Sequence, residues 1–228
     1  MTDVPPSDPQ PPADIAARKD ELRRVLRRAR RERAASRDAT ERAQIAGALA
    51  AAALAYLDGP YLERFGTPAR CVTLFESLPT EVPTDALIEA LHDRGVQIVL
   101  PVLLPDLDLE WIALRDPSER EDPTGIGDLR DAQCHADRLL GREGIARADV
   151  VFAPGMAIDS EGRRLGQGGG SYDRALLRRR PGVPIIALID DAEWSTEPLP
   201  VDERDQRVDG CVRPLAGYRA CPAAPDGP

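Results

Sequence analysis

The amino-acid sequence predicts an α/β fold, a three-layer α/β/α domain with a mainly parallel sheet, and three observations support this. Short apolar segments of strand length alternate with longer helix-like segments along most of the chain. The segments 70–75 and 97–102 flank one helix-like segment, and such strand–helix–strand units build parallel sheets. The run 150–153 is wholly apolar, as expected of a strand that helices cover on both faces.

The N-terminal part of the chain is predicted to be helical after a short tail. Residues 1–13 are rich in proline and acidic side chains, which is typical of a disordered tail. A helix is expected to begin at Asp14, its N-cap, because apolar side chains then recur on one side and arginines on the other. A second, alanine-rich helix is expected over Ala39–Leu57, with Gly59-Pro60 as its breaker.

The remaining elements follow in order as strands and helices of one domain, expected over 14–220, before a loose tail over 221–228. Thr84 is predicted to cap a central helix that Gly95 ends. The expected strands are Arg70–Phe75, Gln97–Val102, Leu107–Leu114 at the sheet edge, Asp149–Ala153, Pro184–Ile189 and Val208–Arg213. The expected helices are Thr84–Arg94, 132–140 and 170–180, with loops over 116–131 and 154–170.

Composition and charge exclude several classes of protein. No apolar run approaches the ~20 residues that a membrane span needs, and the acidic, proline-rich start differs from a secretory signal. We therefore expect a cytoplasmic protein with no membrane partner. The four cysteines lack metal-binding or redox spacing, so we expect free thiols. The net charge of −9 argues against nucleic acid as a partner, and we expect a monomer.

The most informative segment is a glycine-rich loop between a predicted strand and a predicted helix. Gly166 and Gly168–Gly170 lack Cβ atoms where the helix begins, so several backbone N–H groups can point at one anion. Arg163 and Arg164, at the entrance of the loop, add charge-assisted donors. The pattern is neither a P-loop nor a dinucleotide-binding fingerprint. It predicts a phosphate-binding loop.

A basic helix-like segment offers a second contact for an anion. Residues 18–37 carry ten basic side chains, and Lys19 is the only lysine of the chain. Lysine is a compact point charge that suits a phosphate oxygen. Lys19 and Arg23 are four residues apart and therefore lie on one helix face, where both can contact the same anion.

Several motifs together resemble the 5-formyltetrahydrofolate cyclo-ligase family. The longest match contains Pro154-Gly155, Asp159, Gly162 and the run from Arg164 to Asp173, with glycines at 166, 168 and 170 and Tyr172. Shorter matches are Lys19 with Leu22-Arg23, Glu81 with Thr84, Val99 to Pro101, and Asp205 within Val201–Val208. The resemblance covers roughly residues 18–213, all but the two tails.

The resemblance implies the cyclo-ligase fold and a ring-forming reaction that uses ATP and Mg²⁺. It implies that ATP phosphorylates the formyl oxygen of 5-formyltetrahydrofolate and that N10 then closes the ring, giving 5,10-methenyltetrahydrofolate, ADP and phosphate. By resemblance the catalytic residues are Lys19, Arg164 and Tyr172, and the metal ligands are Asp173 and Asp205. The implied ATP-binding residues are Lys19, Arg23, Arg164, Leu165, Gly166, Gln167, Gly168, Gly169, Gly170, Ser171 and Tyr172. The implied folate-binding residues are Glu76, Glu81, Gln167, Gly168, Gly169, Gly170 and Ser171.

Two differences from the family pattern keep other hypotheses open. Many members carry lysine and tyrosine where this chain has Gly169 and Ser171, and the family's Glu-Pro is missing near 125–128. The second hypothesis is therefore a catalytically silent relative that binds folate or nucleotide as a regulator. A third is nucleic-acid binding through the basic segment 18–37, which the overall acidity and the 4% aromatic content oppose.

Each candidate residue also has a structural interpretation. Lys19 and Arg23 fit a solvated basic helix face, and Glu81 fits a turn. Asp173 fits an acidic residue that stabilises a helix dipole in the first turn. Asp205 lies in an acidic run of the kind that is usually a solvated surface. Only the spatial arrangement distinguishes these interpretations from a shared site.

Overall fold

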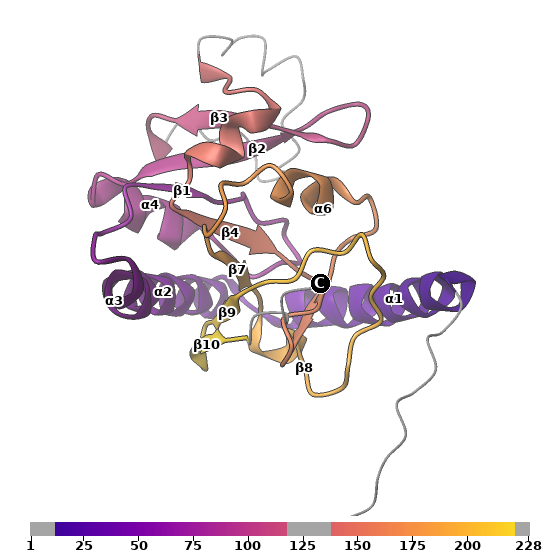
Figure 1. The fold of residues 1–228 in the computed structure, drawn as a ribbon. Helices are drawn as coiled ribbons and strands as arrows, with labels where there is room; N and C mark the ends of the chain where they lie inside the picture. Colours follow the sequence, from indigo (N-terminus) through magenta and orange to yellow (C-terminus); the bar gives the residue numbers. More distant parts are fainter. Residues whose placement is uncertain (1–11, 118–137, 222–228) are drawn as a thin grey trace, which may run out of the picture.

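The central feature of the computed structural model is a seven-stranded sheet in the order β10-β9-β7-β4-β1-β2-β3 (Figure 1). The structure describes residues 12–117 and 138–221. The five inner strands are parallel, and β3 and β10 pair antiparallel at the edges, which confirms the predicted mainly parallel sheet. The strands are β1 (Cys71–Thr73), β2 (Gln97–Leu103), β3 (Leu109–Leu114), β4 (Val150–Pro154), β7 (Ile185–Leu188), β9 (Gly210–Arg213) and β10 (Gly217–Ala220).

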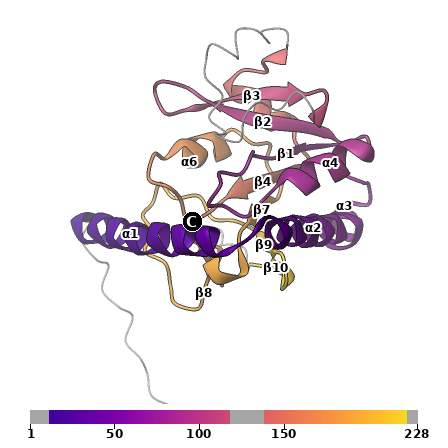
Figure 2. The same ribbon diagram turned by 180° about the vertical axis from the view of Figure 1, so that it is seen from behind.

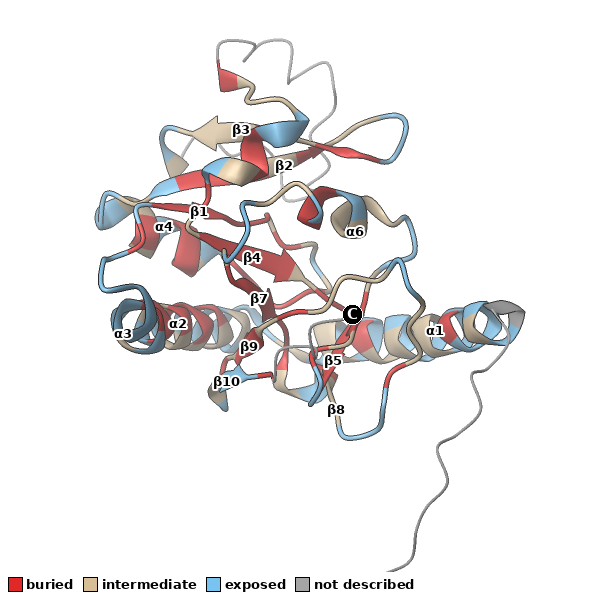
Figure 3. Cartoon of the chain, viewed as in Figure 1, coloured by how far each residue is buried: buried red, intermediate tan, exposed pale blue. Residues whose placement is uncertain are grey.

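Helices cover both faces of this sheet. They are α1 (Pro12–Ser36), α2 (Ala39–Tyr56), α3 (Leu62–Phe65), α4 (Asp85–Asp93) and α6 (Ser171–Leu176), with the π-helical turn η1 (Leu57–Tyr61) and the 3-10 turns η4 (Arg142–Arg147) and η5 (Asp191–Glu193). Along β4, Val150 and Phe152 join the core cluster with α2 and α4, whereas Val151 and Ala153 join the cluster with α6 and η4. Both faces of the central strands are therefore buried, and the predicted three layers are confirmed (Figure 3).

Helix α1 extends from the body of the molecule on the side of a second, small sheet, as the two opposite views show (Figures 1 and 2). This sheet has the order β6-β5-β8, with β5 (Ala157–Asp159), β6 (Arg164–Leu165) and β8 (Trp194–Ser195). Leu22 and Leu26 of α1 pack against a small cluster in which Leu165 is buried. The prediction of a loop over 154–170 was therefore incomplete, because this segment contributes two short strands on which α1 lies.

The N-terminal helix begins two residues before its predicted start. Pro12 opens α1, which is a favourable place for proline because the first helical turn needs no N–H from it. Asp14 then lies in the first turn and is not the N-cap. Residues 12 and 13 of the predicted tail are therefore helical, and residues 1–11 lie outside the described residues.

The prediction that Gly59-Pro60 breaks the second helix is wrong. The pair changes the winding of the helix instead. After α2 the chain continues through the π-helical turn η1, which contains Pro60, into α3. A wider π turn tolerates proline because it does not need the i→i−4 hydrogen bond that proline cannot donate. The helix ends at Gly66, whose φ of 71° lets its N–H donate to the Leu62 carbonyl at 2.8 Å.

The resulting stretch Ala39–Phe65 corrects one expectation from composition. By length and mean hydropathy alone, this stretch of the described chain could cross a membrane. Its buried side chains, including Leu49, Ala53 and Tyr56, belong to the core cluster beneath the sheet. One face of this stretch therefore packs in the interior of the protein, while Leu62 and Phe65 are exposed.

Other elements differ from the prediction in length or number. Helix α6 ends at Leu176, four residues early, and Thr84 precedes α4 without a side-chain cap because its hydroxyl donates to the Phe75 carbonyl at 2.7 Å. Strand β10 was not predicted. Cys221 belongs to the predicted loose tail, yet it is buried and its N–H donates to the Asp209 carbonyl. Most of the loop 116–131, the segment 125–128 and residues 132–137 of the predicted helix 132–140 lie outside the described residues. The end of that predicted helix is wrong, because Leu139 forms an antiparallel bridge with Ile112 and the Leu140 N–H donates to the Trp111 carbonyl at 2.8 Å.

Candidate active site

A pocket of about 840 Å³ lies at the carboxyl ends of the central strands. The chain order reverses between β1 and β4, since β2 lies on one side of β1 and β4 on the other. Ligands of open α/β sheets bind in the crevice at such a switch point. All predicted site residues except Leu165 line this pocket: Lys19, Arg23, Glu76, Glu81, Arg164, Gly166, Gln167, Gly168, Gly169, Gly170, Ser171, Tyr172, Asp173 and Asp205. Leu165 lies in β6 and packs in the cluster under α1.

Lys19 is buried in the wall of the pocket and is not part of a solvated helix face. Only 6% of its surface is exposed, and its ammonium donates to Asp202 Oδ2 at 2.8 Å and to Asp205 Oδ2. The Lys19 ammonium holds the pKa of the Asp202 carboxyl well below its usual range. An ammonium has three N–H donors, so two go to the aspartates and a third is available to the pocket.

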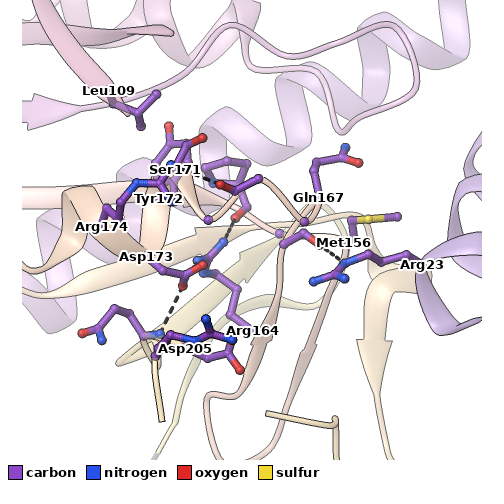
Figure 4. A pocket seen from close by; sticks show the side chains of 18 of the residues that line it. Arg23, Leu109, Met156, Arg164, Gln167, Ser171, Tyr172, Asp173, Arg174 and Asp205 are labelled. Atoms are coloured by element: carbon purple, nitrogen blue, oxygen red, sulfur yellow. Dashed lines mark hydrogen bonds and ion pairs between the residues drawn. The ribbon is translucent and has the colours of Figure 1, made fainter. Parts of the chain in front are cut away.

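Arginines of α1 hold the glycine loop by its carbonyl groups. Arg23 donates from Nε to the Gly166 carbonyl at 3.0 Å and pairs with Asp20 at 2.7 Å. One turn further, Arg27 donates from Nη2 to the Gln167 carbonyl at 2.6 Å. Figure 4 shows Arg23 and Gln167 on one side of the pocket, and Arg164, Asp173 and Asp205 on the other. Residues more than 140 positions apart in the sequence are thus joined at one site.

Two glycines of the loop, Gly168 and Gly170, adopt conformations that other residues avoid. Gly168 has a φ of 110°, and a Cβ built there would lie 3.4 Å from the Arg23 guanidinium carbon. Gly170 has a φ of 68°, and its Cβ would lie 2.8 Å from Arg174 Nη1. Arg174 donates to the carbonyls of Gly169 and Leu107, which ties the loop to the β2–β3 hairpin. Arginine contacts to its carbonyls and the conformations of Gly168 and Gly170 therefore hold the loop in place. Its role as a phosphate-binding loop stays a prediction.

Arg164 supports the loop from below and does not stand at its entrance. Its side chain is almost fully buried, donates to Asp173 Oδ1 at 2.5 Å and to the Pro154 carbonyl at 3.3 Å, and lies 6.0 Å from the Tyr172 ring centre. Arg163, its predicted neighbour at the entrance, pairs instead with Asp159 at 2.6 Å.

The Tyr172 hydroxyl is buried without a hydrogen-bond partner in the described part of the chain. Burial raises its pKa, and the nearby Glu81 carboxylate adds to this effect. The hydroxyl therefore stays protonated and is able to donate to a ligand atom.

Glu81 lies in the segment that follows β1 and lines the pocket. It is 9% exposed, its Oε2 accepts from the Leu78 N–H at 3.1 Å, and Gln167 Nε2 lies 3.5 Å from its Oε1. The buried Arg30 lies behind it, with Nη1 3.4 Å from the same Oε1. Glu81 is thus held by its own turn, yet it also faces the glycine loop across the pocket. Glu76 lines the same wall.

The two predicted metal ligands, Asp173 and Asp205, lie in the same pocket. The Gln206 N–H donates to Asp173 Oδ1 at 3.1 Å, whereas no described residue donates a hydrogen bond to Asp173 Oδ2. Among the described residues, no three His, Cys, Asp or Glu side chains gather closely enough to hold a metal by themselves. Mg²⁺ usually takes one or two carboxylates together with phosphate oxygens. This set of donors fits that use, with Asp173 as the better-placed carboxylate.

Three residues of the site were missed by sequence reasoning: Arg27, Arg30 and Asp202. The helical period offered a signal for Arg30, because positions 19, 23 and 30 share one face of α1. No comparable signal marked Asp202, since it lies in an acidic segment that resembles ordinary surface.

The fold and the pocket define an α/β protein with a pocket lined by charged residues and glycines at the switch point of its sheet. A family model described as the 5-formyltetrahydrofolate cyclo-ligase family matches residues 15–214, and the chain belongs to this family. A 5-formyltetrahydrofolate cyclo-ligase of Mycolicibacterium smegmatis is 29% identical over 156 residues, which cover 66% of this chain and 77% of that protein. The cyclo-ligase of Escherichia coli strain K12 is 32% identical over 151 residues, 64% of this chain and 79% of that protein.

Solved structures show the same fold. The 5,10-methenyltetrahydrofolate synthetase of Aquifex aeolicus matches with a TM-score of 0.63 and 20% identity, covering 92% of this chain and 96% of that chain. That of Mycoplasma pneumoniae matches with a TM-score of 0.59 and 17% identity, covering 82% of this chain and 95% of that chain. The predicted cyclo-ligase fold is thereby confirmed.

Proposed function

We propose that the chain catalyses the ATP-dependent cyclisation of 5-formyltetrahydrofolate to 5,10-methenyltetrahydrofolate, with release of ADP and phosphate. The observation that carries this proposal is the convergence of three distant segments on one pocket. Lys19 and Arg23 come from α1, Glu81 follows β1, and the glycine loop leads into α6. Chance placement of a basic helix face or of surface acids does not explain why these residues meet at the switch point of the sheet.

The reaction needs a good leaving group on a poor electrophile, because the formyl group is an amide. The formyl oxygen attacks the γ-phosphorus and ADP leaves. N10 then attacks the formyl carbon, the C–O bond breaks, phosphate departs with the former formyl oxygen, and N10 loses its proton. For this chemistry the protein must position the reacting groups and neutralise charge. On the phosphate side, positive charge and hydrogen-bond donors come from Lys19, Arg23 and the backbone of the loop.

The other wall of the pocket suits the reduced folate. The Glu81 carboxylate can accept hydrogen bonds from amino and ring N–H groups of a pterin. The protonated Tyr172 hydroxyl can donate to an acceptor such as the formyl oxygen. Glu76 lines the pocket on the same side as Glu81. We assign these three residues to the folate side of the site.

Asp173, with Asp205 as a second carboxylate, would hold Mg²⁺ against the phosphates. The ion would neutralise charge on the β- and γ-phosphates. In the protein, Arg164 orients Asp173 through Oδ1 and leaves Oδ2 for the ion.

The first test is turnover of the purified protein with 5-formyltetrahydrofolate, ATP and Mg²⁺, followed by the absorbance of the methenyl product. We expect product only when both ATP and Mg²⁺ are present. Lys19→Ala should lower kcat/KM by about a hundredfold or more, as expected for loss of a charged donor to the transferred group. Arg28→Ala is the matched control, because Arg28 lies exposed on the same helix and pairs only with Glu32 among the described residues.

A wild type that binds folate or ATP without turnover would support the silent relative and contradict the proposed reaction. Restoring lysine at Gly169 and tyrosine at Ser171 would then show whether these two positions account for the loss. An equal loss in the Lys19 and Arg28 variants would contradict the role assigned to Lys19.

A further inference from the structure

Arg30 is a buried arginine at the centre of a network of charges. Its side chain is 5% exposed, and all three guanidinium nitrogens have partners. Nε donates to Glu193 Oε1 at 2.7 Å, and Nη2 donates to Glu193 Oε2 at 3.0 Å and to the Gly155 carbonyl at 2.5 Å. Nη1 lies 3.4 Å from Glu81 Oε1. Arg30 is not among the residues that line the pocket.

Glu193 is the anchor that keeps this guanidinium in place. Its carboxylate is 2% exposed and also accepts from Arg33 at 2.6 Å and from the Asp190 N–H at 3.1 Å. Burial raises the pKa of the Glu193 carboxyl, and the hydrogen bonds and charge of Arg30 and Arg33 oppose that effect. A buried arginine whose Nε and Nη2 are both held by one carboxylate has little freedom left.

The Nη1 and Nη2 groups therefore point in a fixed direction, toward Glu81 and the Gly155 carbonyl. Gly155 follows β4 and Glu81 follows β1, the two strands between which the chain order reverses. Both residues line the pocket. Arg30 thus sets the positions of the two pocket segments at the switch point without touching the pocket itself.

The position of Arg30 on α1 joins the two sides of the site. It follows Lys19 by eleven residues, close to three helical turns, so both side chains lie on the same face, ~16 Å apart along the axis. Lys19 faces the phosphate side, whereas Arg30 reaches Glu81 on the folate side. One helix therefore carries Lys19, which lines the pocket, and Arg30, which lies behind Glu81.

We infer that Arg30 is a positioning residue for folate binding, which acts by holding the Glu81 carboxylate and the Gly155 carbonyl in place. This inference rests on the proposed function, because it takes Glu81 as a contact of the folate. Arg33 offers a matched comparison. Arg33 lies on the same helix as Arg30 and pairs with the same Glu193 and with Asp190. Unlike Arg30, it forms no hydrogen bond or ion pair with Glu81 or Gly155.

The test compares Arg30→Lys with Arg33→Lys in the full-length protein. Lysine keeps the charge but cannot donate to three partners in one plane. We expect Arg30→Lys to raise KM for 5-formyltetrahydrofolate about tenfold, the loss expected for one charge-assisted contact, with KM for ATP changed less than twofold. Arg33→Lys should leave both KM values unchanged. Melting temperatures of both variants, measured in parallel, show how much each arginine contributes to the stability of the fold.

A double-mutant cycle with Glu81→Gln gives the decisive readout. If Arg30 acts through Glu81, Arg30→Lys should add less than twofold to the folate KM of the Glu81→Gln protein. Full additivity, or an equal rise of both KM values in Arg30→Lys, would overturn the inference. If Arg30→Lys does not fold, Glu81→Asp tests the same contact, since its shorter side chain leaves the Arg30–Glu193 pair intact. An unchanged folate KM in Glu81→Asp would overturn the inference.

Failure of the proposed function gives a different result. If the wild type binds 5-formyltetrahydrofolate but does not turn it over, the same variants are compared by calorimetric Kd, and an about tenfold weaker Kd for Arg30→Lys alone would still support the inference. If the wild type does not bind the folate, both the inference and the proposed function are wrong.

Discussion

Single residues of the glycine loop show how backbone conformation serves the site. Gly168 and Gly169 are neighbours, but only Gly168 has a backbone conformation that requires glycine. Gly168 has a φ of 110°, which side chains rarely adopt, and it lies against Arg23. Gly169 has no such φ, and a Cβ there would meet only Ser171 Oγ at 3.4 Å. Position 169, where many family members carry lysine, can therefore hold a side chain in this chain too.

Gly168→Ala should consequently impair ATP use, whereas Gly169→Ala should not. The added Cβ is strained at this φ and forces the backbone of residue 168 toward another conformation, at a cost of roughly 1–2 kcal/mol. We expect KM for ATP to rise about tenfold in Gly168→Ala and less than twofold in Gly169→Ala. Steady-state kinetics of both variants check this. Equal effects of the two substitutions would show that the positive φ of Gly168 is not required for ATP use.

At the scale of elements, Asp108 ties the β2–β3 hairpin to the turn that follows α6 and to η4. The carboxylate is 4% exposed and pairs with Arg178 at 2.6 Å and with Arg142 at 2.8 Å. Hydrogen bonding from Arg178 lowers the pKa of the Asp108 carboxyl to about 2. A lowered pKa in the folded state means that the pair stabilises the protein above the unfolded pKa, near pH 4, and that this contribution is lost as the pH falls toward 2.

Asp108→Asn should therefore destabilise the protein in a pH-dependent way. From the size of the pKa shift, the free energy of unfolding should fall by about 2 kcal/mol at pH 7. The difference from the wild type should shrink between pH 4 and pH 2. Urea denaturation at several pH values measures both effects. Asp106→Asn is the control, because Asp106 is exposed and, among the described residues, contacts only Arg142 and the Asp108 N–H, which an asparagine Oδ1 also accepts, so little change is expected. A pH-independent difference would contradict the assigned ion pairs.

At the scale of the whole molecule, three cysteines from distant segments lie in one core. Cys71 of β1, Cys211 of β9 and Cys221 after β10 are free, buried and part of the same cluster. Burial raises the pKa of Cys71 and Cys221 to about 11 and that of Cys211 to about 12. These thiols should react only when the molecule opens as a unit.

A thiol reagent at pH 8 tests this cooperativity. We expect no rapid reaction in a Cys134→Ser variant of the native protein, since Cys134 lies outside the described residues, and reaction of all three thiols after denaturation in guanidinium chloride. The midpoint should coincide with the loss of helical circular dichroism. Rapid labelling of one thiol in the native state would show that its segment opens separately.

The elements were predictable where local patterns decide them. The strand–helix–strand unit from Cys71 to Leu103 and the apolar strand Val150–Pro154 follow from periodicity, and the structure contains both. The short strands β5, β6 and β8 were missed because two or three residues carry no recognisable period. Pro60 was misjudged because a π turn, which its neighbours stabilise by packing on the sheet, accommodates it.

The sequence by itself determined the family and the fold class, and it predicted most of the residues that line the pocket, since a long glycine motif and the spacing of Lys19 and Arg23 are local properties. Only the tertiary structure decided what these side chains contact. It placed Lys19 between Asp202 and Asp205, put Arg164 beneath the loop, and brought Arg30 against Glu81. The physical reason is that a buried charge takes its partners from whichever segments fold around it. No spacing along the chain records that choice.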